Sequence, residues 1–131
     1  MNELPLGLLG HAETTVNEQN TAAAMGSGLL PVFATPAMLA LMEQAAASSV
    51  QPYLSQGEGT VGTRLEVSHL AATPIGLSVR AESELTAVDR RKLTFTVRAW
   101  AGEELIGEGT HQRFIIDNQR FLDKALAKRG V

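Results

Sequence analysis

Residues 35–50 read TPAMLALMEQAAASSV, and this stretch decides the fold. Thr35 is a good N-cap residue, and Pro36 suits the first turn of a helix. The apolar run continues to Val50, where Gln51 and Pro52 end it. Many of its side chains are alanine or serine, so other elements can approach it closely. We therefore predict one long central helix that is covered by the rest of the chain.

A single charged residue lies inside this helix. Glu43 is the only Asp, Glu, Lys or Arg between Glu18 and Glu58. A buried carboxylate without a partner is costly, so we expect one to be paired or to take part in chemistry. The alternative is a surface helix with Glu43 facing solvent, but such a helix normally carries a whole charged stripe, and only Gln44 is clearly polar nearby. We therefore expect a buried Glu43 with a function.

Beyond the helix, apolar residues alternate with polar ones, which predicts β-strands. Turn signals divide this part into four antiparallel strands, and they lie at residues 57–59, 73–76, 89–90 and 101–103. We expect the last strand at about 104–116. The N-terminal part is assigned a weak first strand at 11–16 and a loop or short helical lid at 17–33, and the C-terminal part a short helix at 119–128.

These elements form a single α+β domain over residues 1–131, in which a curved antiparallel sheet surrounds one long helix. The free edges of such a sheet favour a homodimer that pairs edge to edge.

Composition excludes several classes of function. The chain has 131 residues, a net charge of -3, 44% hydrophobic and 19% charged residues, and no cysteine. Nothing in this balance favours nucleic acid or an anionic membrane, and neither a disulfide nor a cysteine nucleophile is possible. The three histidines show no metal-ligand spacing, so we expect no metal and no other cofactor. No basic signal-peptide start or membrane-spanning run is present, so we expect a cytoplasmic protein.

Three polar groups fall where a core is expected. They are Thr35 at the helix start, Glu43 two turns further on, and His69 at the end of an apolar strand face. Each has a structural explanation as a cap, a surface group or a core histidine. Together, a hydroxyl, a carboxylate and an imidazole form a possible set of nucleophile, base and orienting group.

Two further residues are candidates for substrate binding. Gly62 interrupts a strand, where a glycine often allows close approach of a ligand, and its N–H could bind a developing oxyanion. The alternative is a bulge or packing glycine. Arg113 could bind a phosphate or carboxylate, or could be a solvated charge near the strand end.

The chain resembles the hotdog fold, and within it the fluoroacetyl-CoA thioesterase family. The resemblance covers roughly residues 10–125, and four separated segments agree in order and spacing. These segments are VFAT (32–35) running into LME (41–43), GEGTVGT (57–63), VSHLAATP (67–74) and IGEGTHQR (106–113).

This resemblance implies an acyl-CoA thioesterase that hydrolyses a small acyl-CoA to the free acid and CoA. It places the family's catalytic threonine, glutamate and histidine on Thr35, Glu43 and His69. It also places substrate-binding positions on Gly62 and Arg113, and we expect Phe33 to contact the substrate.

One segment departs from the family. Its fluoroacetyl-specific member places phenylalanines in the lid, whereas this chain has MGSGLL at residues 25–30 and no aromatic residue in the lid before Phe33. We therefore expect an acyl group other than fluoroacetyl to be preferred. The alternatives to a thioesterase are a hydratase or dehydratase of acyl thioesters, a non-catalytic acyl-CoA sensor, and a structural domain. Five candidates for contacting the CoA phosphates cannot be ranked: Arg64, Arg80, Arg90, Arg91 and Lys92.

Overall fold

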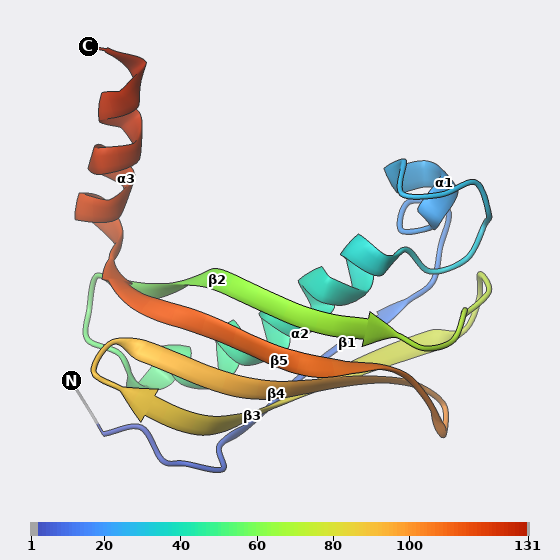
Figure 1. Ribbon diagram of the computed structural model, residues 1–131, viewed down its shortest axis with the longest axis horizontal. Helices are drawn as coiled ribbons and strands as arrows, with labels where there is room; N and C mark the ends of the chain where they lie inside the picture. Colours follow the sequence, from blue (N-terminus) through green and yellow to red (C-terminus); the bar gives the residue numbers. More distant parts are fainter. Residues whose placement is uncertain (1–2, 131) are drawn as a thin grey trace.

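The computed structural model describes residues 3–130 and contains one five-stranded antiparallel sheet in the order β1-β3-β4-β5-β2 (Figure 1). The strands are β1 (Leu9–Thr15), β2 (Glu58–His69), β3 (Ser78–Asp89), β4 (Lys92–Ala101) and β5 (Glu104–Asp117). The four predicted strands and the weaker first strand are therefore all present. β2 and β1 are the two edges, and within residues 3–130 β2 is paired only with β5.

The long helix α2 (Thr35–Val50) packs along the inner face of the curved sheet (Figure 1). Its small side chains allow the close approach that the sequence predicts. The clearest case is Gly10 on β1, where an added Cβ would meet the carbonyl oxygen of Ala45 and lie 2.6 Å from Ser83 Oγ. The 3₁₀ turn η1 (Gln51–Tyr53) follows α2, as Pro52 indicates.

The start of α2 differs from the prediction. Ala34 is the N-cap residue and makes no side-chain capping bond, while Thr35 is the first helical residue. The assignment of Thr35 as the cap is therefore wrong. The physical reason is that the Thr35 hydroxyl is bonded to a side chain on another element, described below.

The core lies between α2 and the inner face of the sheet. Apolar side chains alternate along the strands as expected, and the largest fully buried ones include Phe95, Leu85 and Leu93 opposite Met38 and Met42 of the helix. The turn between β3 and β4 has two residues, Arg90 and Arg91, and Arg90 adopts the left-handed conformation with φ 59° that such tight hairpins require.

Two short helical elements project from opposite ends of the sheet (Figure 1). The lid contains α1 (Ala22–Met25), whose N-cap Thr21 accepts a hydrogen bond from the Ala24 N–H. α3 (Asn118–Leu126) is capped by the Asp117 side chain and is followed by the 3₁₀ turn η2 (Ala127–Arg129). None of the α3 residues is buried. Among residues 3–130, no helix has the length and apolar character needed to cross a membrane.

Candidate active site

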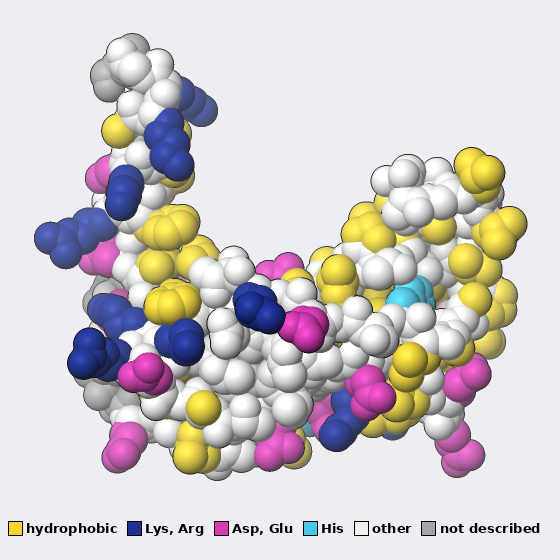
Figure 2. All heavy atoms as spheres, viewed as in Figure 1, with side chains coloured by type: hydrophobic (Ala, Val, Ile, Leu, Met, Phe, Trp, Pro, Cys, Tyr) yellow, Lys and Arg dark blue, Asp and Glu magenta, His cyan; other side chains and the backbone are white. Residues whose placement is uncertain are grey.

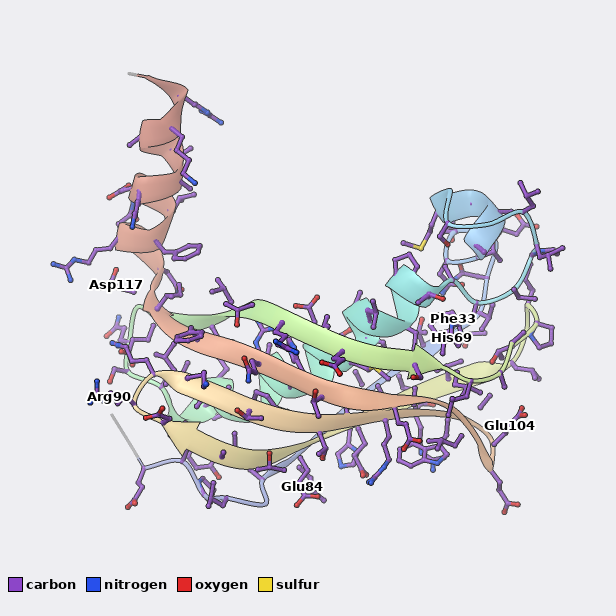
Figure 3. All side chains as sticks on the ribbon, in the orientation of Figure 1. Phe33, His69, Glu84, Arg90, Glu104 and Asp117 are labelled. Carbon is purple, nitrogen blue, oxygen red and sulfur yellow. The ribbon has the colours of Figure 1, made fainter. Side chains whose placement is uncertain are left out.

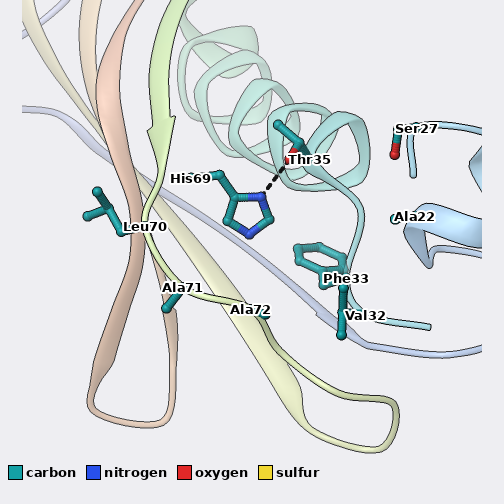
Figure 4. A pocket seen from close by; sticks show the side chains of 9 residues that line it. All are labelled: Ala22, Ser27, Val32, Phe33, Thr35, His69, Leu70, Ala71 and Ala72. Carbon is teal, nitrogen blue, oxygen red and sulfur yellow. Dashed lines mark hydrogen bonds between the residues drawn. The ribbon is translucent and has the colours of Figure 1, made fainter. Parts of the chain in front are cut away.

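Thr35 and His69 are joined at the lid end of the molecule. Thr35 is the first residue of α2 and His69 is the last residue of β2, so the fold brings together groups 34 positions apart. Thr35 Oγ1 and His69 Nδ1 are hydrogen-bonded at 2.7 Å (Figure 4). The predicted partnership of this hydroxyl and this imidazole is therefore present.

This pair lies in the wall of a cavity of about 340 Å³. Phe33 lines the same cavity, and Ala22 and Ser27 contribute to it from the lid (Figure 4). Phe33 is fully buried, and its N–H donates to the Thr73 carbonyl, which fixes the backbone beside the cavity. The lid, the helix start and the end of β2 therefore form one small chamber.

The chamber favours a neutral imidazole at His69. Burial lowers the pKa of His69 from its usual 6.5, and the Ala71 backbone offsets only part of this effect. The Nε2 atom is buried and has no hydrogen-bond partner among residues 3–130. A neutral imidazole with a free second nitrogen is suited to general acid–base work.

Glu43 is part of a second polar cluster, further along α2. Its Oε2 accepts a hydrogen bond from Arg113 Nη1 at 3.1 Å. The Glu43 side chain is 40% exposed, whereas that of Arg113 is only 8% exposed. The prediction of a buried Glu43 is therefore wrong: the carboxylate is paired and half exposed.

Arg113 is the centre of this second cluster. Its Nε donates to Thr60 Oγ1 at 2.8 Å, and its Nη2 donates to the Thr60 carbonyl at 3.0 Å. Burial lowers the pKa of Arg113, and Glu43 opposes the shift, so the guanidinium remains charged. The alternative of a solvated charge at the strand end is excluded, because Arg113 is buried on the inner face of β5.

His111 completes the cluster and must be neutral. Its Nδ1 lies 2.8 Å from the Arg64 carbonyl, which can only accept, so Nδ1 carries the proton. Its Nε2 lies 3.2 Å from Arg113 Nη1, which can only donate, so Nε2 carries the lone pair. Burial lowers the pKa of His111 from 6.5, in agreement with this tautomer.

Gly62 lies directly against the Glu43 carboxylate. It is opposite Arg113 in the β2–β5 register, beside a bulge. An added Cβ would contact Glu43 Oε2 and would lie 3.2 Å from both Arg113 Nη1 and His111 Cε1. The glycine is therefore required by packing, because it lets the Glu43 carboxylate lie directly against the backbone of β2.

The predicted residues thus form two clusters within the chain. Thr35, His69 and Phe33 form one, and Glu43, Gly62 and Arg113 form the other. Thr35 and Glu43 are eight residues apart on α2, which corresponds to about 12 Å along the helix. The structure therefore brings together two parts of the predicted set, without joining Glu43 to the hydroxyl and the imidazole.

Two members of the second cluster were not predicted as site residues from the sequence. His111 and Thr60 are both needed to satisfy Arg113. The signal for His111 was available, because positions 111, 113 and 115 alternate onto the face that carries the buried Ile115. Thr60 left no comparable signal. In the part of the chain that the structure describes, no group of three or more His, Asp or Glu residues is placed to hold a metal ion.

Over residues 16–119 the sequence matches the family described as fluoroacetyl-CoA-specific thioesterase. The chain belongs to this family. One relative, the fluoroacetyl-CoA thioesterase of Streptantibioticus cattleyicolor, is 45% identical over 97 residues, which make up 74% of this chain and 70% of the relative. The chain is therefore a thioester hydrolase, and the predicted family is confirmed.

Solved structures of thioesterases agree closely with this fold. A structure of the fluoroacetyl-CoA thioesterase superposes with a TM-score of 0.92 at 35% identity, covering 97% of this chain and 98% of the other. A variant of that enzyme in complex with fluoroacetate and CoA gives 0.85 at 36% identity, covering 90% and 99%. A thioesterase superfamily member from Thermus thermophilus gives 0.88 at 28% identity, covering 98% and 97%. These matches confirm the predicted hotdog fold.

Proposed function

We propose that this thioesterase hydrolyses small acyl-CoA thioesters to the free acid and CoA. The observation that carries the proposal is the hydrogen bond between the Thr35 hydroxyl and the His69 imidazole in the wall of a small chamber. The chamber volume suits a short acyl group, and the family relatives act on an acyl-CoA. Thr35, Glu43 and His69 are the proposed catalytic residues, and Gly62, Arg113 and Phe33 the proposed substrate-binding residues.

The separation of Glu43 from Thr35 favours a site shared between two subunits. β2 is an edge strand, and a homodimer that pairs the two β2 edges antiparallel would set the His69 end of one strand beside the Gly62 end of the other. The Thr35–His69 pair would then face Glu43 of the partner subunit. We propose this homodimer as the active form, with no metal or redox cofactor in the reaction.

In the proposed mechanism, water adds to the thioester carbonyl carbon and the carbon–sulfur bond breaks. Glu43 takes the proton from the attacking water and passes it to the neutral His69 imidazole, which gives it to the departing CoA sulfur, so that both side chains end the reaction in their starting protonation states. Thr35 orients the imidazole through its hydrogen bond, and the Gly62 N–H stabilises charge on the carbonyl oxygen. Direct attack by Thr35 or Glu43 on the carbonyl is the covalent alternative, which the placement of these side chains leaves open.

The preferred acyl group is a separate proposal. Besides Phe33, the lid contributes the side chains of Ala22, Ser27 and Val32 to the chamber, and none of these three is aromatic. This composition supports the prediction of a preference other than fluoroacetyl. The description of the family points the other way, to fluoroacetyl. Comparing kcat/KM for fluoroacetyl-CoA and acetyl-CoA decides between them: a ratio below about tenfold, which equals 1.4 kcal/mol, supports the unselective enzyme.

The decisive experiment measures thiol release from acyl-CoAs of increasing length. We expect turnover by the wild type, and a loss of about 10²-fold or more in kcat/KM for Glu43→Ala and for His69→Ala. Gln44→Ala is the matched control, because Gln44 is an exposed residue of the same helix as Glu43. Near-wild-type activity in a folded Glu43→Ala or His69→Ala variant would contradict the role given to that residue.

A further inference from the structure

The positive charge of the chain is concentrated at the end opposite the chamber. Seven of the eleven Lys and Arg residues belong to the β3–β4 turn, to the start of β4, to α3 or to η2, although the net charge is -3. They are Arg90, Arg91, Lys92, Arg120, Lys124, Lys128 and Arg129. Figure 2 shows dark blue Lys and Arg side chains gathered around the base of α3 and along its length. Figure 3 shows that Arg90 and Asp117 lie at this end, and Phe33 and His69 at the other.

Three of these cations line one groove between α3 and the sheet. The groove has a volume of about 280 Å³ and contains Arg91, Arg120 and Lys124, with Ile115 as an apolar wall. Phe121 lines it as well, and this residue is 47% exposed. The groove therefore combines cationic side chains with an accessible aromatic face.

One cation of the groove is held in place by a salt bridge, and within the part of the chain that the structure describes the other two are free to bind an anion. Arg91 is fixed by Glu58, with its Nη2 2.9 Å from Glu58 Oε2. Arg120 and Lys124 are four residues apart, so they lie on one side of α3. Neither forms a salt bridge within residues 3–130. One carboxylate, Asp117, also lines the groove, and it is engaged as the α3 cap through the Arg120 N–H.

We propose that this groove binds the phosphorylated nucleotide of CoA. Guanidinium groups bind phosphate oxygens in pairs, and a lysine adds a compact charge, which suits a diphosphate and a 3′-phosphate. The exposed Phe121 ring offers a stacking face for the adenine. This inference rests on the proposed function, and it adds a nucleotide site formed by Arg91, Arg120, Phe121 and Lys124.

The groove lies within reach of the second polar cluster. Arg113 and Asp117 are both on β5 and four residues apart, which corresponds to about 13 Å. The pantetheine arm of CoA, with its two amide links, is about as long as four extended residues, or roughly 14 Å. A nucleotide in the groove can therefore hold its thioester beside Glu43 and Gly62, where the Thr35–His69 pair of the partner subunit would complete the site.

The test compares two substrates that differ only in the nucleotide. In the Arg120→Glu/Lys124→Glu double variant, we expect KM for acetyl-CoA to rise at least tenfold with kcat nearly unchanged. We expect KM for acetyl-pantetheine, which lacks the nucleotide, to stay the same. The matched control is the Arg98→Glu/Arg129→Glu double variant, which has the same change of net charge at exposed positions outside the groove. Arg120→Gln/Lys124→Gln provides a milder change.

Direct binding of adenosine 3′,5′-bisphosphate separates this inference from the proposed function. Titration calorimetry should detect binding to the wild type and to the control, with affinity reduced at least tenfold in the groove variants. Equal affinity in all proteins, or equal KM values for acetyl-CoA, overturns the nucleotide site. Absence of hydrolysis of every acyl thioester overturns the proposed function, while the titration still decides whether the groove binds the nucleotide.

Discussion

Glu43 can lie against β2 only because residue 62 is a glycine. The carboxylate occupies the space that a side chain at position 62 would need, and Arg113 and His111 enclose the same point. A glycine in a strand normally weakens the strand, so its presence here marks a place where close approach matters more than strand stability. Position 62 therefore controls where the proposed catalytic carboxylate sits.

Gly62→Ala should move the Glu43 carboxylate without altering any ionisable group. We expect kcat/KM to fall by at least tenfold while far-ultraviolet circular dichroism stays unchanged, because the new methyl group displaces Oε2 from its bond to Arg113. Thr63→Ala serves as the control, since Thr63 is an exposed neighbour in the same bulge. Wild-type kinetics in Gly62→Ala would show that the position of the carboxylate does not matter.

Single residues also show what the sequence could predict and what it could not. The identities of Thr35, Glu43 and His69 as unusual polar groups could be read from their apolar surroundings. The hydrogen-bond partner of the Thr35 hydroxyl could not be predicted in this way. A local pattern cannot distinguish a helix-capping bond from a bond to a residue 34 positions away. The exposure of Glu43 was misjudged for the same reason, since its partner Arg113 lies 70 positions further along the chain.

At the scale of elements, Arg113 links three of them. From β5 it bonds to Thr60 on β2 and to Glu43 on α2, and it contacts His111 on its own strand. Burying a guanidinium is tolerated when its donors find acceptors, and four of the five N–H donors of Arg113 do so here. The strands could be predicted from the alternation of apolar and polar residues, and the central helix from the residues that begin and end it. The contacts of Arg113 could not, because they depend on the pairing register of β2 and β5, which is set only in the folded sheet.

Arg113→Met should destabilise the fold, because it leaves buried acceptors on Thr60 without a donor. We expect the free energy of unfolding to fall by about 2 kcal/mol, the usual effect of leaving buried polar groups unsatisfied. Urea denaturation followed by tryptophan fluorescence measures this. Arg64→Met is the matched control, since the exposed Arg64–Glu66 pair contributes less than about 1 kcal/mol. Equal stabilities of the two variants would contradict the role of Arg113 as a cross-link.

At the scale of the whole molecule, the buried His111 and the half-buried His69 connect stability to pH. Burial lowers the pKa of both His69 and His111 below the 6.5 expected in the unfolded chain. Between the folded and unfolded pKa values, the unfolded chain binds more protons than the folded one. The free energy of unfolding should therefore be highest above this range and should decrease as the pH falls below 6.5.

Urea titrations between about pH 7.5 and about pH 5.5, above the range in which carboxylates titrate, measure this dependence. His111→Asn should flatten the curve, because the amide can still donate to the Arg64 carbonyl but cannot be protonated. The same acidic slope in wild type and variant would assign the pH dependence to other groups. A rise in stability on acidification would show that the pKa shifts have the opposite sign.

The proposed dimer makes a charge prediction for the edge strand. If the two β2 strands pair about Leu65, Arg64 of one subunit faces Glu66 of the partner subunit. Arg64→Glu then places like charges opposite each other twice, and we expect the dimer dissociation constant to rise at least tenfold in sedimentation velocity. The Arg64→Glu/Glu66→Arg double variant should return the dimer dissociation constant to the wild-type value. A monomeric wild type would refute the dimer, and failure of the double variant to restore pairing would refute this register.

The exposed position of α3 has a consequence for product release. A nine-residue helix with no buried residue is too short to persist on its own in water, so its amide hydrogens should exchange with solvent quickly in the free chain. If the nucleotide of CoA binds against α3 as proposed, binding must also order this helix, and the cost of ordering weakens the binding of the CoA product. We therefore expect a short residence time of free CoA, which would limit inhibition of the enzyme by its own product.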